Sequence, residues 1–417
     1  MSLLFTPPPE DGRVPPAPAP QQTPHVVRDD AEAIEIAHRL AAVFAPDAAL
    51  RDRERRLPWA ELEAFSASGL WGITVPREYG GAGVSNTTLA EVIAIIAAAD
   101  GSLGQIPQNH FYALEVLLRV GGTAAQKAFF YARALAGERF GNALAEIGHK
   151  DFRRRTRLTQ DGDGFRIDGK KFYCTGALYA HWIPTLVVAE DAGQEVTWLA
   201  FVPRAAAGVT VTDDWDGFGQ RVTGSGSVGF DNVRVEAEWV VPFLASFERP
   251  TTIGPVAQLM HAAIDLGIGR GALAATLPFL RDHARPWIDA RVERATDDPL
   301  TLHHLGEVHV RLRAAEALVR RAGRITDAAQ QAPDERTVAE ASVAVAAARA
   351  LTTTASLLAG TRLFELGGTS ATLDHRGLDR FWRNARTHTL HDPVRWKYHA
   401  VGNFHLNHTL PPRHGAI

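Results

Sequence analysis

The spacing of apolar residues changes twice along this chain of 417 residues, and these changes constrain its fold more than any other feature. A helical period begins at Asp30 and continues to about residue 138, as the positions between Ile34 and Phe44 illustrate. Short alternating runs separated by turn residues replace it over residues 139–247, and the helical period then returns. The sequence therefore predicts a fold of class α+β, with strands between two helical regions.

Four segments follow from these changes. We expect an N-terminal helical domain at residues 29–138, a β-domain at 139–247 and a helical bundle at 248–417. The short strands favour a small antiparallel barrel or a sandwich for the β-domain. Residues 1–28 are rich in proline, alanine and glutamine, and they bury too little apolar surface to offset the entropy of ordering. We therefore expect a flexible tail there, or packing on a neighbouring subunit where the tail is ordered.

Two glycine patterns and one apolar run add detail. Asp161-Gly-Asp-Gly164 lies between two strand-like runs and predicts a β-hairpin. Gly267-Ile-Gly-Arg-Gly271 looks like a dinucleotide loop, but no strand precedes it, so close helix packing is the better interpretation and no nicotinamide site is expected. Ala341–Leu358 is nearly all small or apolar, which is typical of a helix buried in a bundle core or at a subunit interface.

Charge and composition narrow the classes of partner. The net charge is −3 and the pI about 6.6, so the chain has no basic field that would favour nucleic acid. We find neither a run of about 18 apolar residues nor a signal peptide, and so expect no membrane span. Cys174 is the only cysteine and cannot form an internal disulfide. Together these features predict a cytoplasmic protein that binds neither nucleic acid nor membrane.

Histidine and aspartate residues gather near the C-terminus, in the pattern His388-x-x-His391-Asp392. Such residues either ligate a metal or contact a cofactor. Zinc needs three or four ligands in a defined geometry, and the sequence offers no second, suitably spaced cluster. We therefore expect no metal and favour a cofactor contact.

Several motifs occur in a fixed order over about residues 30–410. They are Val75-Pro-Arg-Glu-Tyr-Gly-Gly-Ala-Gly83, Gly169-x-Lys-x-x-x-Thr175, Gly229-Phe-Asp-Asn-Val-Arg-Val235, Leu366-Gly-Gly368 and Arg383-Asn-Ala-Arg-Thr-His-Thr-Leu-His-Asp392. In this order they resemble the acyl-CoA dehydrogenase superfamily. The resemblance implies an N-terminal helical domain, a central antiparallel β-barrel, a C-terminal four-helix bundle, a bound flavin and a homotetramer.

At three motif positions the residues of this chain differ from those of the acyl-CoA dehydrogenases. Those enzymes remove the α-proton of an acyl thioester with a glutamate, and here Asp392 stands at that position, followed by Pro393 instead of glycine. Aspartate is one methylene shorter and proline fixes the backbone, which weakens the case for a base. Ser370 replaces a glycine where the family contacts a dinucleotide. An FAD-dependent acyl-CoA dehydrogenase with Asp392 as base is the alternative prediction.

The chain also resembles a narrower branch, the dibenzothiophene monooxygenases and their sulfur-acquisition relatives. The shared segments include Ala98–Gly104, Pro255–Leu259, Ala284–Trp287 and Thr387–Pro393. These relatives are two-component enzymes, so the resemblance implies reduced FMN from a separate NAD(P)H:flavin reductase. It also implies oxygenation of a small organosulfur compound with O₂ through a flavin C4a-(hydro)peroxide. N-oxygenation occurs on the same scaffold, so the motifs leave the oxygenated atom open.

The resemblance assigns roles to individual side chains. The flavin contacts that it implies are Asn142, Thr175, Trp215, Ser225, His391 and, at the phosphate across a subunit interface, Arg285. The catalytic residues that it implies are His110, His391, Thr175 and Asp392. The two histidines would face the reactive edge of the flavin, where imidazole exchanges a proton near neutral pH. Taken alone, His110 is a packing histidine at a helix end and Trp215 a core tryptophan, and a helical scaffold without flavin is a third alternative.

Overall fold

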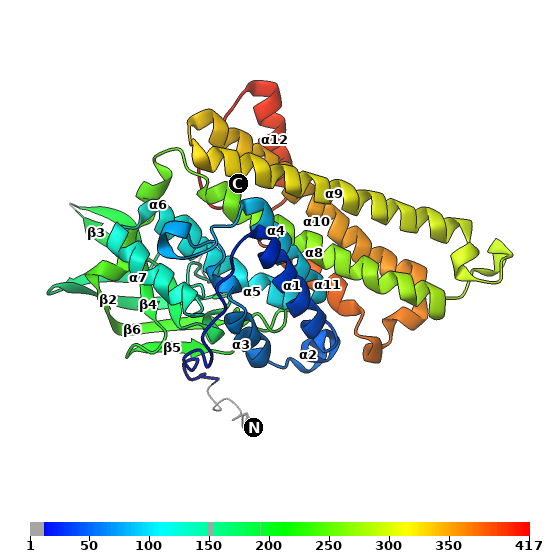
Figure 1. The fold of residues 1–417 in the computed structure, drawn as a ribbon, viewed down its shortest axis with the longest axis horizontal. Coiled ribbons are helices and arrows are strands. Elements are labelled where there is room, and N and C mark those ends of the chain that lie inside the picture. Colours follow the sequence, from blue (N-terminus) through cyan, green and yellow to red (C-terminus); the bar gives the residue numbers. More distant parts are fainter. Residues whose placement is uncertain (1–11, 149–152, 192) are drawn as a thin grey trace.

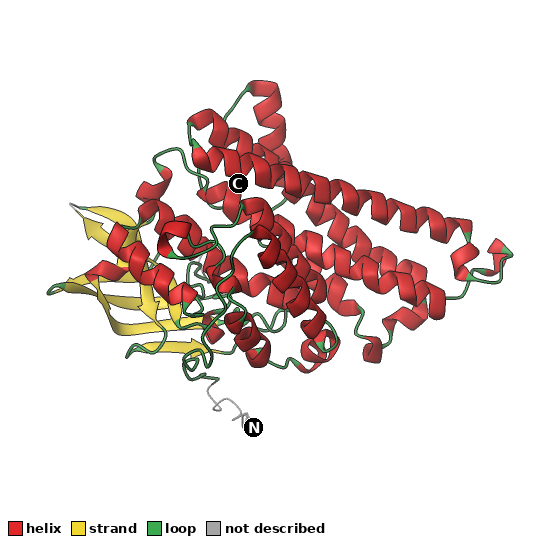
Figure 2. Ribbon diagram, viewed as in Figure 1, coloured by secondary structure: helices red, strands yellow, loops and turns green. Residues whose placement is uncertain are grey.

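The computed structural model describes residues 12–148, 153–191 and 193–417. The molecule is elongated, with a β-sheet at one end and long C-terminal helices at the other (Figures 1 and 2). The N-terminal helices lie between them and contact both. This arrangement confirms the predicted order of helices, strands and helices.

The N-terminal region is helical. It contains α1 (Asp30–Phe44), α2 (Ala48–Glu54), α3 (Trp59–Ala67), α4 (Asn86–Ala99), α5 (Gly101–Phe111), a π-helix (Tyr112–Leu118), α6 (Arg119–Gly121) and α7 (Ala124–Leu135), with short 3-10 helices at Leu70–Gly72 and Arg77–Tyr79. The side chains of Asp29, Ser85 and Asp100 accept backbone N–H groups and so cap α1, α4 and α5. These caps fix where the helices begin, and so fix the junction between α4 and α5.

The central region is one mixed sheet. Its strands are β1 (Arg157–Asp161), β2 (Gly164–Lys171), β3 (Trp182–Asp191), β4 (Gln194–Pro203), β5 (Val209–Thr212), β6 (Ser227–Glu236) and β7 (Val240–Pro242), in the order β5-β6-β2-β1-β3-β4-β7. The predicted hairpin is β1–β2, closed by the pair Asp161 and Gly164. The expected antiparallel pairing has one exception, because β1 runs parallel to β3 where Arg157 faces Val188. Short 3-10 helices at Ala177–Tyr179, Ala237–Trp239 and Leu244–Phe247 complete the region.

The C-terminal region is a helical bundle. It contains α8 (Ile253–Asp282), α9 (Pro299–Gln331), α10 (Glu335–Gly367), α11 (Asp379–His388) and α12 (Arg395–Asn407), with 3-10 helices at Ile288–Ala290, Ala295–Asp297, Thr369–Thr372 and Asp374–Arg376. The helices α8, α9 and α10 pack on one another, and α4 packs on α8 and α9. The bundle core therefore includes a helix from the N-terminal region.

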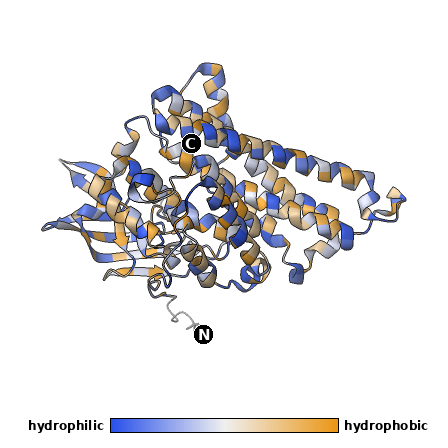
Figure 3. Ribbon diagram, in the orientation of Figure 1, coloured by the Kyte–Doolittle hydropathy of each residue, from blue (hydrophilic) through white to orange (hydrophobic). Residues whose placement is uncertain are grey.

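Two bundle helices are apolar enough to cross a membrane by length and composition, namely α8 and α10. The most apolar windows of these two helices are 67% and 72% buried, so inside this fold they are core helices. Figure 3 shows many more hydrophilic residues on α9, which covers them on one side. The predicted burial of Ala341–Leu358 is confirmed, since this stretch is the middle of α10 and is buried along most of its length.

The glycines of α8 permit a close crossing with α4. A Cβ atom at Gly267 would lie 2.4 Å from the Ala94 carbonyl oxygen, and one at Gly271 would lie 2.4 Å from the Ala98 carbonyl oxygen. Both distances are far below van der Waals contact, so neither position has room for a side chain. The helix-packing interpretation of residues 267–271 is confirmed.

The described part of the N-terminal tail packs on its own chain. The Val14 amide donates to the Val211 carbonyl oxygen of β5 at 3.1 Å, and the His25 amide donates to the Ala67 carbonyl oxygen at 2.9 Å. Val27 is buried. Residues 12–28 thus differ from the expected flexible tail and contact this subunit, because backbone groups at a sheet edge bind an extended segment whatever its side chains.

Gly267→Ala is expected to lower the free energy of unfolding by about 1–3 kcal/mol, because the added methyl group pushes α8 from the α4 backbone. The control is Gly306→Ala on α9, where a Cβ meets nothing within 4 Å. There the same change should raise stability by about 0.5–1 kcal/mol through helix propensity. Urea unfolding measures both, and equal small effects would contradict the tight crossing.

Candidate active site

A series of hydroxyl groups lies beyond the end of β2. The Thr175 and Ser225 hydroxyl oxygens are 2.7 Å apart, and those of Ser225 and Thr223 are 2.6 Å apart. Thr223 donates to the Gln220 carbonyl oxygen at 3.0 Å. Because each hydroxyl has one proton, Ser225 must donate to Thr223, and Thr175 must donate to Ser225. The oxygen of Thr175 is left as a hydrogen-bond acceptor.

Aromatic rings and strained backbone surround these hydroxyls. Tyr173 and Gln220 have φ angles of 59° and 50°, in the left-handed region that non-glycine residues rarely adopt. Such outliers persist where the surroundings hold them, often at functional sites. The Tyr173 ring is 47% exposed and lies 6.2 Å from that of half-buried Trp215, whose indole N–H donates to the Gln220 carbonyl oxygen at 2.9 Å. Two accessible rings beside polar hydroxyls suit a flat ligand with hydrogen-bonding edges.

Asn142 lies at the edge of the same group. Its side-chain amide donates to the Tyr173 carbonyl oxygen at 3.4 Å. The structure therefore brings together Asn142, Thr175, Trp215 and Ser225, which the sequence predicted as flavin contacts.

The loop that carries these groups is fixed to the bundle. The Gln220 amide donates to the Asn384 side-chain oxygen of α11 at 2.6 Å, and the Gln220 side chain donates to the Gly101 carbonyl oxygen. A Cβ at Gly219 would lie 2.1 Å from the Arg383 carbonyl oxygen, so only glycine allows this approach. The helix α11 continues directly into the segment His388–Asp392.

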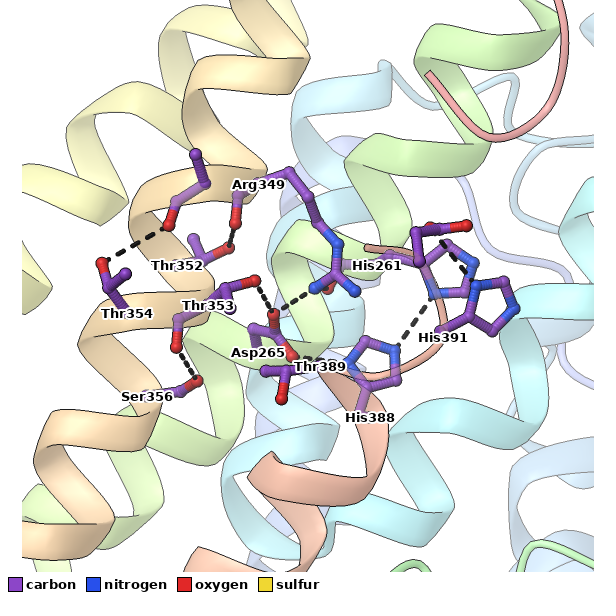
Figure 4. A network of polar contacts seen from close by, with 12 residues as sticks. His261, Asp265, Arg349, Thr352, Thr353, Thr354, Ser356, His388, Thr389 and His391 are labelled. Atoms are coloured by element: carbon purple, nitrogen blue, oxygen red, sulfur yellow. Dashed lines mark hydrogen bonds and ion pairs between the residues drawn. The ribbon is translucent and has the colours of Figure 1, made fainter. Parts of the chain in front are cut away.

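A buried polar network holds His388 (Figure 4). Its Nδ1 lies 2.5 Å from Asp265 Oδ1, and its Nε2 lies 3.1 Å from His261 Nδ1. The other carboxylate oxygen of Asp265 accepts hydrogen bonds from Arg349 and from the Thr353 hydroxyl. All five residues are buried, and they come from α8, α10 and α11.

His391 and Asp392 form the exposed end of this network. The His391 side chain is 48% exposed, and its Nδ1 lies 3.3 Å from Asp392 Oδ2. That oxygen accepts no well-aligned hydrogen bond from the described residues. Burial acts to raise the pKa of Asp392, but the adjacent imidazoles and the Lys397 ammonium outweigh it and hold that pKa well below its usual range. Asp392 is therefore an ionised carboxylate beside an accessible imidazole.

His261, His391 and Asp392 place possible ligand atoms within 4.8 Å of one another. Ligands about 2.1 Å from one zinc ion lie within about 4 Å of each other. The rings of His261 and His391 also face each other, with centroids 4.0 Å apart and planes 37° apart. Imidazole lone pairs lie in the ring plane, so two facing rings do not direct them at one ion. The geometry is that of two tilted imidazole rings in contact beside a carboxylate.

His110 lies in the aromatic core of the N-terminal region, against Phe140, which is two residues before Asn142. Its Nε2 lies 2.8 Å from the Trp71 carbonyl oxygen, and its Nδ1 accepts the Phe140 amide at 3.2 Å. Burial lowers the pKa of His110 to about 3. Both ring nitrogens are engaged by backbone groups, and the side chain is fully buried. These contacts are those of a packing histidine at the end of α5, and the role at a flavin edge that the resemblance implies stays a prediction.

Arg285 lies apart from the other predicted flavin contacts. It is exposed in the segment between α8 and α9, at the end of the molecule opposite the sheet (Figure 1). Its neighbours Trp287 and Ile288 are 71% and 80% exposed. Within one chain the segment between α8 and α9 therefore lies far from the sheet region that holds Thr175.

The sequence did not point to His261, Asp265 or Arg349. Two signals were present. His261 and Asp265 are four residues apart and so share one face of a helix. Arg349 is the only charged residue in Ala341–Leu358, and a charge in a buried helix needs a partner.

A cavity of about 350 Å³ borders the loop that follows Trp215. Its lining is largely charged and comprises Ala49, Asp52, Arg53, Asp216, Gly217, Phe218, Arg221, Asp374, Gly377, Asp379 and Arg383. Asp52 and Asp379 both pair with Arg383. This cavity offers little apolar surface for a flat ring and contains none of the predicted flavin contacts.

Comparison with known proteins agrees with this geometry. Models of the acyl-CoA dehydrogenase N-terminal, middle and C-terminal domains match residues 31–138, 148–233 and 259–396. A dibenzothiophene monooxygenase of Rhodococcus erythropolis is 37% identical over 397 residues, which cover 92% of this chain and 95% of the relative. The probable FMNH2-dependent monooxygenase SfnC of Pseudomonas putida is 32% identical, over 91% of this chain and 96% of the relative.

Among solved structures, FMN-bound TdsC from Paenibacillus sp. A11-2 superposes with a TM-score of 0.88 at 34% identity, covering 92% of this chain and 100% of TdsC. The matched middle and C-terminal domains include Thr175, Trp215 and Ser225 in the one and His391 and Asp392 in the other. The chain therefore belongs to the acyl-CoA dehydrogenase family, in the branch of the FMN-dependent dibenzothiophene monooxygenases.

Proposed function

We propose that this protein oxygenates a small organosulfur compound with O₂ and reduced FMN. The observation that carries the proposal is the acceptor oxygen of Thr175, set by the hydroxyl series and placed among accessible rings. Reduced flavin carries an N5–H donor that oxidised flavin lacks, so an acceptor suits the reduced form. When bound, reduced FMN supplies the electrons that activate O₂. Overall, R₂S, O₂ and FMNH₂ give R₂SO, H₂O and FMN, which balances atoms and electrons.

His391 is the group that exchanges protons in this proposal. Its Nδ1 faces the Asp392 carboxylate, which leaves Nε2 directed away from the pair. An ionised carboxylate orients an imidazole and stabilises its protonated form, as in hydrolase triads. Thr175 holds the cofactor, and Asn142, Trp215 and Ser225 complete its surroundings. The half-exposed ring of His391 supplies or takes up the proton that water formation requires.

The dehydrogenase alternative is weakened by Asp392. A carboxylate whose pKa lies well below its usual range is a poor base for a C–H proton. Asp392 is also buried and directed at His391. Its position therefore supports a role in orienting an imidazole.

Partners and assembly are part of the same proposal. The relative SfnC is named as FMNH2-dependent, which supports a separate NAD(P)H:flavin reductase as the source of the reduced FMN. The remote, exposed Arg285 and its apolar neighbours support a homotetramer in which this segment reaches the FMN phosphate of another copy. We place the enzyme in the cytoplasm, without nucleic-acid or membrane partners.

Oxygenation is tested with photoreduced FMN, O₂ and dibenzothiophene or methyl phenyl sulfide. Sulfoxide formation is expected with reduced FMN and not with oxidised FMN alone. His391→Ala should lower the sulfoxide formed per FMN oxidised and raise H₂O₂ release, because the proton donor is lost, while the exposed His405→Ala serves as control. Turnover of an acyl thioester with FAD in the absence of O₂, abolished by Asp392→Asn, would establish the dehydrogenase instead.

Thr175→Val is expected to weaken binding of reduced FMN roughly tenfold and binding of oxidised FMN much less, because only the reduced form donates from N5. Anaerobic fluorescence titration measures both affinities. Thr361→Val, on the exposed side of α10, is the control. An equal loss for the two forms would argue against an acceptor role for Thr175.

The pH dependence of stability tests the packing role of His110. Its pKa is 6.5 in the unfolded chain and about 3 in the fold, so below pH 6.5 the unfolded state takes up a proton that the folded state does not. Stability should therefore fall as the pH falls. His110→Gln keeps a donor for Trp71, and should flatten this slope by at most about 1.4 kcal/mol per pH unit. An unchanged slope in denaturant unfolding would show that His110 is not a buried neutral imidazole.

A further inference from the structure

We propose that His261, Asp265 and Thr353 are positioning residues that fix the tautomers of His388 and His261 and hold the His391 ring in place. The proposal rests on the proposed oxygenation, because His391 is the proton-exchanging group there. None of the three residues belongs to the motifs that the sequence analysis singled out.

The direction of the hydrogen bonds follows from the charge on Asp265. This carboxylate is fully buried and bound by the Arg349 guanidinium, so it is ionised and only accepts. His388 Nδ1 must therefore carry the proton that it directs at Asp265 Oδ1. His388 Nε2 then has no proton and accepts one from His261 Nδ1. One buried charge thus sets the tautomers of two histidines in series.

The surrounding charges also limit the protonation of His261 and His388. Asp265 is already paired with Arg349, so a proton added to His388 would be a second buried positive charge at that carboxylate. The Asp392 carboxylate favours a charged His261, but burial outweighs it. Burial accordingly lowers the pKa values of both His261 and His388. His391 is the one imidazole of the three that solvent reaches.

His261, the last residue of this hydrogen-bonded series, contacts His391. With Nδ1 committed as donor, His261 carries no proton on Nε2 and gives Asp392 no hydrogen bond. Its ring faces that of His391 at 4.0 Å and supports it from the buried side. His391 Nδ1 is therefore the donor closest to Asp392 Oδ2, at 3.3 Å. The network leaves one arrangement for His391, with Nδ1 toward Asp392 and Nε2 outward (Figure 4).

Two adjacent threonines on α10 provide a matched test. Both are buried, and both donate one hydrogen bond, Thr353 to Asp265 Oδ2 and Thr352 to the Arg349 carbonyl oxygen. Thr353→Val removes a donor from the carboxylate, whereas Thr352→Val makes the same chemical change beside it. The two variants should lose similar melting temperature. Only Thr353→Val should raise H₂O₂ released per FMNH₂ oxidised, roughly twofold to tenfold.

A second pair of variants separates the contacts of the series. His261→Asn keeps a donor at the Nδ1 position for His388 but removes the ring that faces His391. His388→Asn keeps a donor for Asp265 but removes the acceptor for His261. Both should raise H₂O₂ release and lower kcat, with little change in the KM of the sulfide.

A readout without flavin completes the test. Amide hydrogen exchange of the flavin-free protein over residues 386–392 should be faster in His261→Asn and Thr353→Val than in Thr352→Val. Unchanged exchange and unchanged H₂O₂ release in both would overturn the positioning role while oxygenation by the parent protein stands. If the parent protein forms no sulfoxide, the proposed function fails, and the exchange experiment still decides whether the network positions His391.

Discussion

The geometry of the histidine cluster in the bundle depends on one buried group, the carboxylate of Asp265. A lone carboxylate at the crossing of α8 and α10 would be strongly destabilising. Arg349, Thr353 and His388 together satisfy it, and they come from α10 and α11. One charge therefore fixes the relative positions of three helices. Pairs of this kind contribute little net stability, and here the pair gives the histidine cluster a single geometry.

The two groups of site residues divide the chemistry between domains. The sheet region supplies hydroxyls and rings that suit a flat cofactor, and the bundle supplies the imidazoles and their carboxylates. Gln220 joins the sheet region to the bundle through Asn384 and to the N-terminal helices through Gly101. The acyl-CoA dehydrogenase scaffold is retained, but Asp392, near the C-terminal end of the site, lies beside His391. An aspartate at position 392, where the dehydrogenases have a glutamate, thus accompanies the different reaction proposed for the same fold.

Local patterns were sufficient for much of the fold. The order of helices and strands, the β1–β2 hairpin and the tight packing at Gly267 all follow from spacing and turn residues. The strand β7 was missed because three residues carry too little periodicity. The tail was misjudged because its order comes from backbone hydrogen bonds at β5, which composition does not reveal.

The site was harder to predict, since tertiary contacts decide it. The sequence identified Thr175, Ser225, Trp215 and Asn142 as a group, and the fold does bring them together. It could not show that the backbone around Trp71 and Phe140 encloses His110. Nor could it join His261 to His388, because 127 positions separate them. Pairing of a lone buried charge such as Arg349 can be expected from sequence, but its partner cannot.

The direction of the hydroxyl series also bears on how long each form of the cofactor stays. The Thr175 hydroxyl donates its hydrogen bond to Ser225, so its oxygen presents a lone pair on the other side. A ring nitrogen that has lost its hydrogen meets that lone pair without a proton between them, and the two repel. Under the proposed contact, oxidised FMN would therefore leave the site faster than reduced FMN. An enzyme that receives reduced flavin from a second protein depends on exchange of the flavin as much as on the reaction itself.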